Sequence, residues 1–209
     1  MRDWPDGQPI GPGDDPMTEI QCHTCHARVA GYDAIHFGSI ETGYRDLCSR
    51  CFNEEVARRG QLTFEHVGFE PVDMSDAAGV KHRFHFLLRH LGDRVALEAF
   101  EVQGGERGGY ELQILDDAEV DLFELMARLV ERMRRALALR HLVDDGLTLS
   151  IADMSVRGRV SCDPESEGYR VPILVIDGRE VSLEQFGQML MTFEGWQFKL
   201  EIKDRSEEV

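Results

Sequence analysis

Alternating apolar and polar positions in the middle of the chain predict three consecutive β-strands. Residues 84–88, 95–100 and 110–114 each place an apolar side chain at every second position. This period of two is the period of a strand whose faces differ in their surroundings. Turn-forming residues connect the three segments, at 90–93 and in the glycine-rich stretch 104–109. The pattern therefore predicts an antiparallel meander.

The pattern then changes to a helical period over residues 117–140, which we expect to form the longest helix. Its apolar positions follow i, i+3, i+4 and i+7 spacing, which gives one broad stripe; they are Leu122, Leu125, Met126, Leu129, Val130, Met133, Ala136 and Leu137. Glu124 with Arg128, and Glu131 with Arg135, are spaced to form ion pairs. A group of arginines on this helix could bind phosphate, but these pairings favour a solvated face; the group is Arg128, Arg132, Arg134, Arg135 and Arg140.

The last third of the chain shows short-range signals of strand, turn and helix. The apolar run 171–176 predicts a central strand, and Asp177-Gly178 is typical of a two-residue hairpin turn. Ser182 and Gln185 form the pattern of a capping box, which predicts a helix beginning at Leu183. Apolar residues alternate again over 196–202 and predict a closing strand.

Four cysteines near the N-terminus carry the strongest chemical signal. Cys22 and Cys25 form one C-x2-C pair, and Cys48 and Cys51 form a second one after 22 intervening residues. Two such pairs are the ligand set of one tetrahedral Zn²⁺ ion. With four thiolates the ion has no position left for water or substrate, so the predicted zinc is structural. Cys162 is left over as a free thiol.

The residues around these pairs predict a small zinc module. A hairpin is expected within 32–44, and a helix of two to three turns is expected after Cys51, ending at Gly60. Each C-x2-C pair is expected to fold as a tight turn, or knuckle, that points both sulfurs at one ion. A knuckle, a hairpin, and a second knuckle that leads into a helix form the layout of treble-clef and LIM-like zinc ribbons. His23, His26 and His36 lie nearby, and with four cysteines present we expect them to be exposed rather than ligands.

Together these elements predict an α+β protein that begins with a zinc ribbon and continues into a mostly antiparallel sheet with two helices. The predicted divisions are a disordered leader at residues 1–16, a zinc-ribbon module at 17–60, a connector at 61–80 and an α+β domain at 81–205. The leader is rich in Pro and Gly and has no hydrophobic period, so it could be an extension before a true start at Met17.

The charge of the chain limits its partners. The formal net charge is -16, of which residues 17–60 contribute only -1. Such a balance repels phosphate backbones at long range, which disfavours nucleic acid but leaves a local basic site open. The sequence has no apolar run long enough to span a membrane and no signal-peptide pattern at its start. We therefore expect a cytoplasmic protein with no membrane partner, in which paired cysteines bind metal rather than form disulfides.

Two further groups of residues are weaker candidates for chemistry. His82, His85 and His90 lie close in sequence, with His85 the best candidate, but residues three apart on a strand point to opposite faces. Glu201 and Lys203, with Asp177 upstream, resemble the acidic and lysine residues of metal-dependent nucleases. Because this triplet is common by chance, and Asp177 suits a turn, the simpler interpretation is structural.

Several segments resemble a family of bacterial zinc-ribbon proteins of unknown function. They are the paired cysteines, Lys81-His-Arg-Phe-His-Phe86, Met133-Arg-Arg135, Val156-Arg-Gly-Arg159, Ile176-Asp-Gly-Arg-Glu180 and the stretch from Phe186 to Leu200. The resemblance covers most of residues 20–205 and implies a zinc-binding fold, but no activity.

Three classes of function are consistent with the sequence. A non-enzymatic interaction or adaptor protein that binds a protein partner is favoured by the closed metal site and the acidic charge. The second class is a nucleic-acid-binding accessory factor that uses the ribbon, Arg157, Arg159 and the helix arginines. The third is an enzyme that uses His85 or the carboxylates, such as a metal-dependent hydrolase or nuclease. No residue is assigned a catalytic role.

Overall fold

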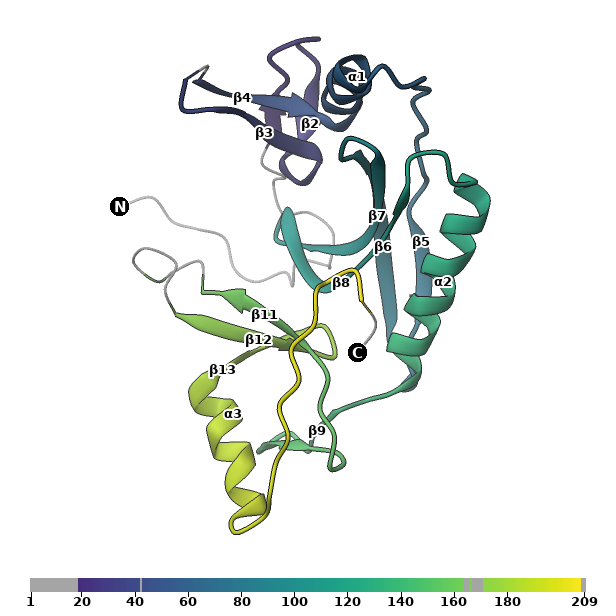
Figure 1. Ribbon diagram of the computed structural model, residues 1–209. Helices are drawn as coiled ribbons and strands as arrows, with labels where there is room; N and C mark the ends of the chain where they lie inside the picture. The colour runs from purple at the N-terminus through teal and green to yellow at the C-terminus, as the bar shows by residue number, and fades with distance from the viewer. Residues whose placement is uncertain (1–18, 42, 164–165, 167–170, 208–209) are drawn as a thin grey trace, which may run out of the picture.

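The computed structural model describes residues 19–41, 43–163, 166 and 171–207, and the predicted leader at 1–16 lies outside them. Within this part of the chain the fold is α+β, with three α-helices and antiparallel strand pairs (Figure 1). None of the helices described is long and apolar enough to cross a bilayer.

The first region consists of two small hairpins and a helix. β1 (Glu19–Gln21) pairs with β2 (Arg28–Ala30), and β3 (Ala34–Ser39) pairs with β4 (Gly43–Cys48). The helix α1 (Ser49–Gly60) follows directly. The predicted hairpin and helix are both present. The residue that ends the helix in a left-handed conformation is Gln61, with φ of 56°, and not Gly60.

A four-stranded sheet forms the centre of the molecule. Its order is β5 (Val72–Ser75), β6 (Lys81–His90), β7 (Arg94–Gln103) and β8 (Glu106–Asp117), and all neighbours are antiparallel. The predicted meander is thus confirmed. β5 lies inside the predicted connector, where Pro and Gly residues hid a short strand that pairs Val72 with Phe84 of β6. The predicted glycine-rich loop is a two-residue turn, Gly104-Gly105, and residues 106–109 belong to β8.

The helix α2 (Leu122–Ala138) packs on one face of this sheet (Figure 1). Asp121 caps it by accepting hydrogen bonds from the backbone N–H groups of Phe123 and Glu124. One side chain per turn is fully buried, namely Leu125, Leu129, Met133 and Leu137, and these pack against Phe84, Leu97 and neighbouring sheet residues. This is the main hydrophobic core, and it follows the predicted stripe.

The central strand β7 is covered on both faces, which the alternating pattern did not indicate. All six residues from Val95 to Phe100 are buried, including the carboxylate side chain of Glu98. α2 covers one face. Tyr32 of the first region packs on Phe100 of the other face, with ring centroids 5.6 Å apart.

The last region holds its own small core. β9 (Leu142–Asp144) pairs with β10 (Leu149–Ile151), and β11 (Arg159–Cys162), β12 (Pro172–Ile176) and β13 (Arg179–Ser182) form a three-stranded sheet with β12 in the centre. The helix α3 (Leu183–Leu190) follows β13. Leu142, Ile176, Val181 and Met189 form a hydrophobic cluster separate from the main core. The single α+β domain at residues 81–205 stays a prediction.

The predicted closing strand at 196–202 is wrong. After α3 and a short 3-10 turn (Met191–Phe193), the chain runs back toward β8 without forming a strand (Figure 1). Its apolar side chains are exposed, at 63% for Trp196, 90% for Phe198, 75% for Leu200 and 78% for Ile202. Apolar and polar residues do alternate along this segment, but the described part of the chain does not cover its apolar side.

Candidate metal centre and other clusters

The structure brings the four predicted cysteines together. Cys22 follows β1, Cys25 lies in the turn before β2, Cys48 ends β4, and Cys51 lies in the first turn of α1. Their Sγ atoms all lie within 4.8 Å of one another. Cys22, Cys48 and Cys51 are buried, while Cys25 is exposed. The group can hold a metal ion.

The spacing of the sulfurs fits a tetrahedral ion. A Zn–S bond of about 2.3 Å in a tetrahedron separates two sulfurs by about 3.8 Å. The Sγ atoms of Cys25 and Cys48, which come from different knuckles, lie 3.8 Å apart. None of the five cysteines forms a disulfide. The donor set and its size therefore fit Zn²⁺.

The local backbone explains how the first knuckle forms. The Cys22 N–H donates to the Ala27 carbonyl at 2.9 Å, and the His26 N–H donates to the Cys22 carbonyl at 2.9 Å. His26 has φ of 60°, which turns the chain sharply after Cys25. A second link joins the knuckles, because the His23 N–H donates to the Asp46 carbonyl of β4 at 2.8 Å.

The thiols differ in how their surroundings affect ionisation. Burial opposes ionisation of Cys22, but the backbone N–H groups of Cys25, Cys48 and Thr24 outweigh it and lower its pKa to about 6. Burial raises the pKa of Cys48 and of Cys51, and at Cys51 the neighbouring sulfurs raise it further. A bound divalent cation would reverse this by favouring the thiolates.

The three histidines near the knuckles are exposed, as predicted. His23 and His26 lie at the surface of the first turn. His36 stacks on Tyr44, with ring centroids 4.9 Å apart, and its Nδ1 lies 2.9 Å from Asp46 Oδ1. In the described part of the chain, the four cysteines are the only group of three or more potential ligand side chains that meets at one point.

The histidines of β6 do not share a site. The His85 ring packs against the rings of both Tyr32 and Phe100, with centroids 5.1 and 6.0 Å away, and burial followed by the charge of Arg83 lowers its pKa. His90 is buried against Phe64, and burial lowers its pKa too. Both rings act as neutral packing groups.

His82 has the more polar surroundings, which sequence reasoning missed. Its Nδ1 lies 2.9 Å from Glu101 Oε1, and its Nε2 lies 3.6 Å from Asp76 Oδ2. The Asp76 carboxylate also accepts the N–H groups of Ala78 and Val80, at 2.9 and 2.8 Å, so it closes the turn after β5. The Asp76 contact lies across the β5–β6 pair, which could not be predicted while β5 was taken for a connector.

The nuclease-like residues lie in structural roles. Asp177 has φ of 52° in the hairpin turn, and its carboxylate accepts the N–H groups of His141 and Leu142 at 2.7 and 2.8 Å. Glu201 is paired with Lys199 and Lys203, at 3.3 and 3.6 Å, in the exposed tail.

Most of the α2 arginines also have partners within the protein. Arg128 pairs with Asp116 of β8, and Arg134 and Arg135 pair with Glu131 at 3.6 and 3.5 Å. Arg132 donates to the carbonyl of Gln113 at 2.6 Å and to carbonyls of residues 205–207. Arg128 and Arg132 therefore hold the helix to β8 and to the end of the chain, while Arg134 and Arg135 pair within the helix.

Three family models match successive segments of the chain, and each segment contains one of the three hydrophobic clusters. Residues 21–60 match the Domain of unknown function (DUF7685), residues 65–138 the Domain of unknown function (DUF7686), and residues 140–207 the Domain of unknown function (DUF7713). No curated protein and no solved structure matches the chain. The first matched segment contains all four clustered cysteines. These family descriptions name neither a metal nor an activity, so the resemblance to bacterial zinc ribbons stays a prediction.

Proposed function

We propose that this protein is a non-enzymatic, zinc-binding adaptor that binds a basic protein partner through the exposed apolar side of residues 196–202. In this proposal Cys22, Cys25, Cys48 and Cys51 hold one structural Zn²⁺ in a treble-clef-like module. The four thiolates leave the ion no open position, so its contribution is to the folded shape. The proposed location is the cytoplasm, where thiols stay reduced.

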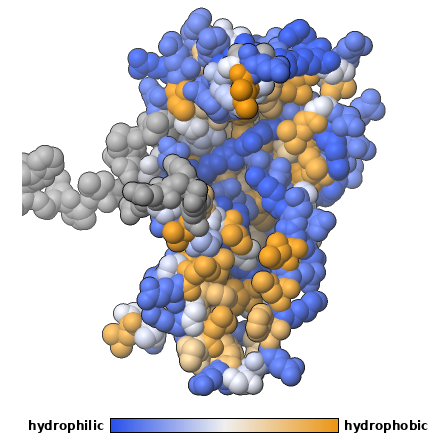
Figure 2. All heavy atoms as spheres, turned by 60° about the vertical axis from the view of Figure 1, so that its left-hand side comes forward, coloured by the Kyte–Doolittle hydropathy of each residue, from blue (hydrophilic) through white to orange (hydrophobic). Residues whose placement is uncertain are grey.

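The observation that carries the proposal is the uncovered apolar stripe. Trp196, Phe198, Leu200 and Ile202 lie on alternate residues of an extended segment and are all exposed. Figure 2 shows that apolar side chains gather over the lower part of the face it presents, where Figure 1 places the last region of the chain. Contiguous exposed apolar surface on a soluble protein marks an interaction site. An extended segment that is not in a sheet can also accept a strand from a partner.

The charge of the chain indicates the kind of partner. With a formal net charge of -16, the protein attracts basic surfaces and repels acidic ones at long range. A basic protein with its own apolar contact residues fits both properties. Nucleic acid receives less support, because the helix arginines are largely occupied by Asp116, Glu131 and backbone carbonyls.

The test is photo-crosslinking in the source cells, followed by affinity measurement. A photoreactive phenylalanine analogue at position 198 should capture one basic protein, whereas the same analogue at position 199, on the other side of the segment, should not. With the purified partner, Phe198→Ser combined with Leu200→Ser should weaken binding by about 10-fold or more, since each large side chain contributes roughly 1.5–3 kcal/mol when buried. Lys199→Ser is the matched control and should change binding less than about 3-fold.

Two outcomes would contradict the proposal. Equal crosslinking from positions 198 and 199 would show that the stripe is not the contact. A purified chain that forms a dimer, and becomes a monomer in the double serine variant, would assign the stripe to a second copy of this chain. Light scattering on the purified chain distinguishes these cases.

A further inference from the structure

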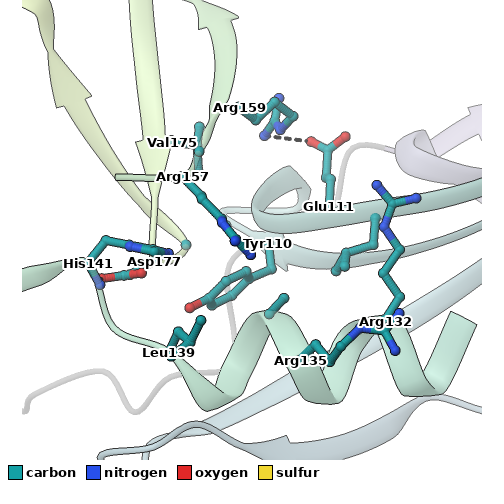
Figure 3. A pocket seen from close by; sticks show the side chains of 15 residues that line it. Tyr110, Glu111, Arg132, Arg135, Leu139, His141, Arg157, Arg159, Val175 and Asp177 are labelled. Carbon is teal, nitrogen blue, oxygen red and sulfur yellow. Dashed lines mark hydrogen bonds and ion pairs between the residues drawn. The ribbon is translucent and has the colours of Figure 1, made fainter. Parts of the chain in front are cut away.

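A cavity of about 180 Å³ lies where α2, β8 and the β12–β13 turn meet. Each of these three elements contributes to its lining, with Tyr110 from β8, Arg135 from α2 and Asp177 from the turn. Figure 3 shows the α2 residues on one side of it and Arg157, His141 and Asp177 on the other. The cavity is therefore formed only when the last region is folded against the central sheet.

The lining of this cavity is basic although the protein is strongly acidic. Four arginines line it, namely Arg132, Arg135, Arg157 and Arg159, together with His141. The carboxylates in the lining are Glu111 and Asp177, so the formal charge of the lining residues is +2 with His141 neutral; Glu131, outside the lining, pairs with Arg135. In a chain of net charge -16, this is a local reversal of sign.

The segment Arg157-Gly158-Arg159 is fixed in place against β12. A Cβ atom at Gly158 would lie 2.6 Å from the Val175 carbonyl oxygen, so a larger residue does not fit there without movement. Residues two apart in an extended chain point to the same side, so the close approach of Gly158 sends both arginines to one side. Arg159 is further held by Glu111, with Nη2 2.9 Å from Oε1, yet its buried Nε has no hydrogen-bond partner.

Arg157 leaves donors available at the cavity, and His141 presents one ring nitrogen to it. Within the described part of the chain, Arg157 makes no hydrogen bond or ion pair, and Figure 3 shows its side chain extending toward Tyr110. His141 is oriented by its own contacts, because its Nδ1 lies 3.0 Å from the Ser155 carbonyl and its backbone N–H donates to the Asp177 carboxylate. Nδ1 therefore carries the proton, so Nε2 of the neutral ring is an acceptor and adds no donor for an anion.

We propose that this cavity binds a phosphomonoester dianion that carries a small apolar body. A phosphomonoester has a charge of about -1.5 to -2 near pH 7, which matches the +2 lining better than a single carboxylate does. Guanidinium groups suit it because they donate paired, charge-assisted hydrogen bonds to its oxygens. Leu112, Leu139, Val175 and the Tyr110 ring supply apolar walls for the rest of the ligand.

The volume limits the ligand to a small one. Sites for drug-sized ligands have volumes of about 300–1,000 Å³, so a cavity of about 180 Å³ suits a group no larger than a phosphorylated aromatic ring. That chemistry can come from a free small molecule or from a phosphorylated side chain of a protein. The site shares no lining residue with the segment 196–202, so the test of this site is independent of the test of the proposed adaptor contact.

The test is calorimetric titration of the full-length, zinc-loaded protein with phenyl phosphate. We expect saturable binding to one site, with inorganic phosphate binding more weakly because it lacks the apolar body. Benzoate, with one negative charge, should bind at least about 10-fold more weakly than phenyl phosphate. Arg157→Gln should weaken phenyl phosphate binding by about 5- to 30-fold, the range expected for a lost hydrogen bond between charged groups at an exposed position.

Arg83→Gln is the matched control, because it removes the same charge from an exposed side chain outside the cavity. It should leave the affinity within about 2-fold of that of the unchanged protein. Arg157 makes no hydrogen bond or ion pair with the described residues, so Arg157→Gln should fold normally, and an unchanged melting temperature verifies this. No binding of phenyl phosphate, equal loss in both variants, or equal binding of benzoate would overturn the proposal.

A phosphotyrosine in a short neutral peptide then identifies the source of the ligand. At least 10-fold tighter binding than phenyl phosphate, lost in Arg157→Gln, would support a phosphorylated protein as the natural ligand. Weaker peptide binding with intact phenyl phosphate binding would support a free small molecule. Both results uphold the site and differ only in what supplies the dianion.

Discussion

At the scale of single residues, Glu98 joins the parts of the chain more directly than any other side chain in the described structure. It lies on the central strand β7 and is 2% exposed. Its carboxylate pairs with Arg89 of β6 at 2.9 Å, Arg107 of β8 at 2.7 Å and Arg205 of the tail at 2.9 Å. Arg107 also donates to the Tyr32 carbonyl at 3.2 Å, so the cluster reaches the first region as well.

We expect Glu98→Gln to destabilise the protein by about 3–5 kcal/mol, because it leaves three guanidinium groups without their only shared carboxylate. The measurement is the free energy of unfolding in urea. Glu131→Gln is the matched control: Glu131 also pairs with two arginines, but its side chain is 53% exposed. That variant should lose less than about 1 kcal/mol. Similar losses of stability in the two variants would show that the buried Glu98 cluster stabilises the protein no more than the exposed pairs of Glu131.

His85 provides a second prediction, on pH. Burial and then Arg83 lower its pKa, so below the usual histidine pKa of about 6.5 the unfolded chain binds a proton that the folded one does not. Stability from His85 is therefore complete above that value and declines as the pH falls toward the folded pKa. His85→Phe keeps a ring packed against Tyr32 and Phe100 but cannot titrate. Its stability relative to the unchanged protein should be higher at pH 5.5 than at pH 7.5, with zinc in excess. An identical difference at both pH values would contradict this.

Neither role was evident from the sequence, for a physical reason. Sequence spacing identifies ligands that act in close pairs, such as Cys22 with Cys25, because their geometry is local. Glu98 and Arg205 are 107 residues apart and meet only through the folded topology. An acidic residue within an apolar strand is a usable signal, since Glu98 stands between Leu97 and Ala99. The number of arginines that pair with Glu98, however, cannot be predicted from the sequence.

At the scale of elements, local signals were the most reliable guide. The predicted capping box is present: Ser182 Oγ accepts the Gln185 N–H at 3.1 Å, and Gln185 Oε1 accepts the Ser182 N–H at 3.0 Å. Both bonds join residues three apart, so no knowledge of the tertiary fold is needed to foresee them. The Asp177-Gly178 turn and α2 were predictable for the same reason.

Ser182→Ala should destabilise α3 by about 1 kcal/mol, because the first turn of the helix loses an acceptor for an otherwise unpaired N–H. The expected signs are a lower urea midpoint and faster amide exchange in residues 183–186. Ser155→Ala is a suitable control, since Ser155 contributes a backbone carbonyl, to His141, that the change retains. Exchange in α3 that does not respond to Ser182→Ala would mean that packing of Met189 alone holds the helix.

The tail at 196–202 shows where a pattern of elements fails. Alternation reveals that one side of an extended segment is apolar, but it cannot reveal whether the same chain or another molecule covers that side. β5 shows the opposite error, because a strand of four residues next to Pro71 is too short for its period to stand out. In both cases the sequence pattern does not show which segment or molecule lies next to the residues in question.

At the scale of the whole molecule, the cysteine region is joined to the sheet by a few specific contacts. Asn53 of α1 is 2% exposed; its Nδ2 donates to the Leu88 carbonyl at 2.7 Å, and its Oδ1 accepts the His90 N–H at 2.8 Å. Together with Arg107 and Tyr32, this pair of bonds attaches one edge of β6 to the region that the thiols hold. The hydrophobic cluster around Cys22, Leu47 and Phe52 is nevertheless separate from the main core.

This separation leads to a prediction on metal removal. A structural zinc site contributes an apparent 10–16 kcal/mol near neutral pH in small zinc peptides. Three of the five buried residues in this cluster are the cysteines themselves, and its two large apolar side chains, Leu47 and Phe52, supply only about 3–6 kcal/mol together. We therefore expect strong chelator to unfold residues 19–60 while α2 and β8 keep their own core. Hydrogen exchange on the full chain should show loss of protection in β3, β4 and α1, a partial loss at the Leu88–His90 edge, and none in α2.

Cysteine variants separate the metal effect from a general effect of the chelator. Metal analysis of the purified chain should give one zinc per molecule, absent in Cys51→Ser and retained in Cys162→Ser, because Cys162 is exposed and lies outside the cluster. Cys51→Ser should reproduce the exchange pattern of the chelated protein without any chelator, since three thiolates bind the ion too weakly to hold the two knuckles together. If metal removal instead unfolded α2 and the cysteine region in one step, the Asn53 and Arg107 contacts would couple the two cores fully. The zinc would then stabilise the whole molecule and not only the module that it closes.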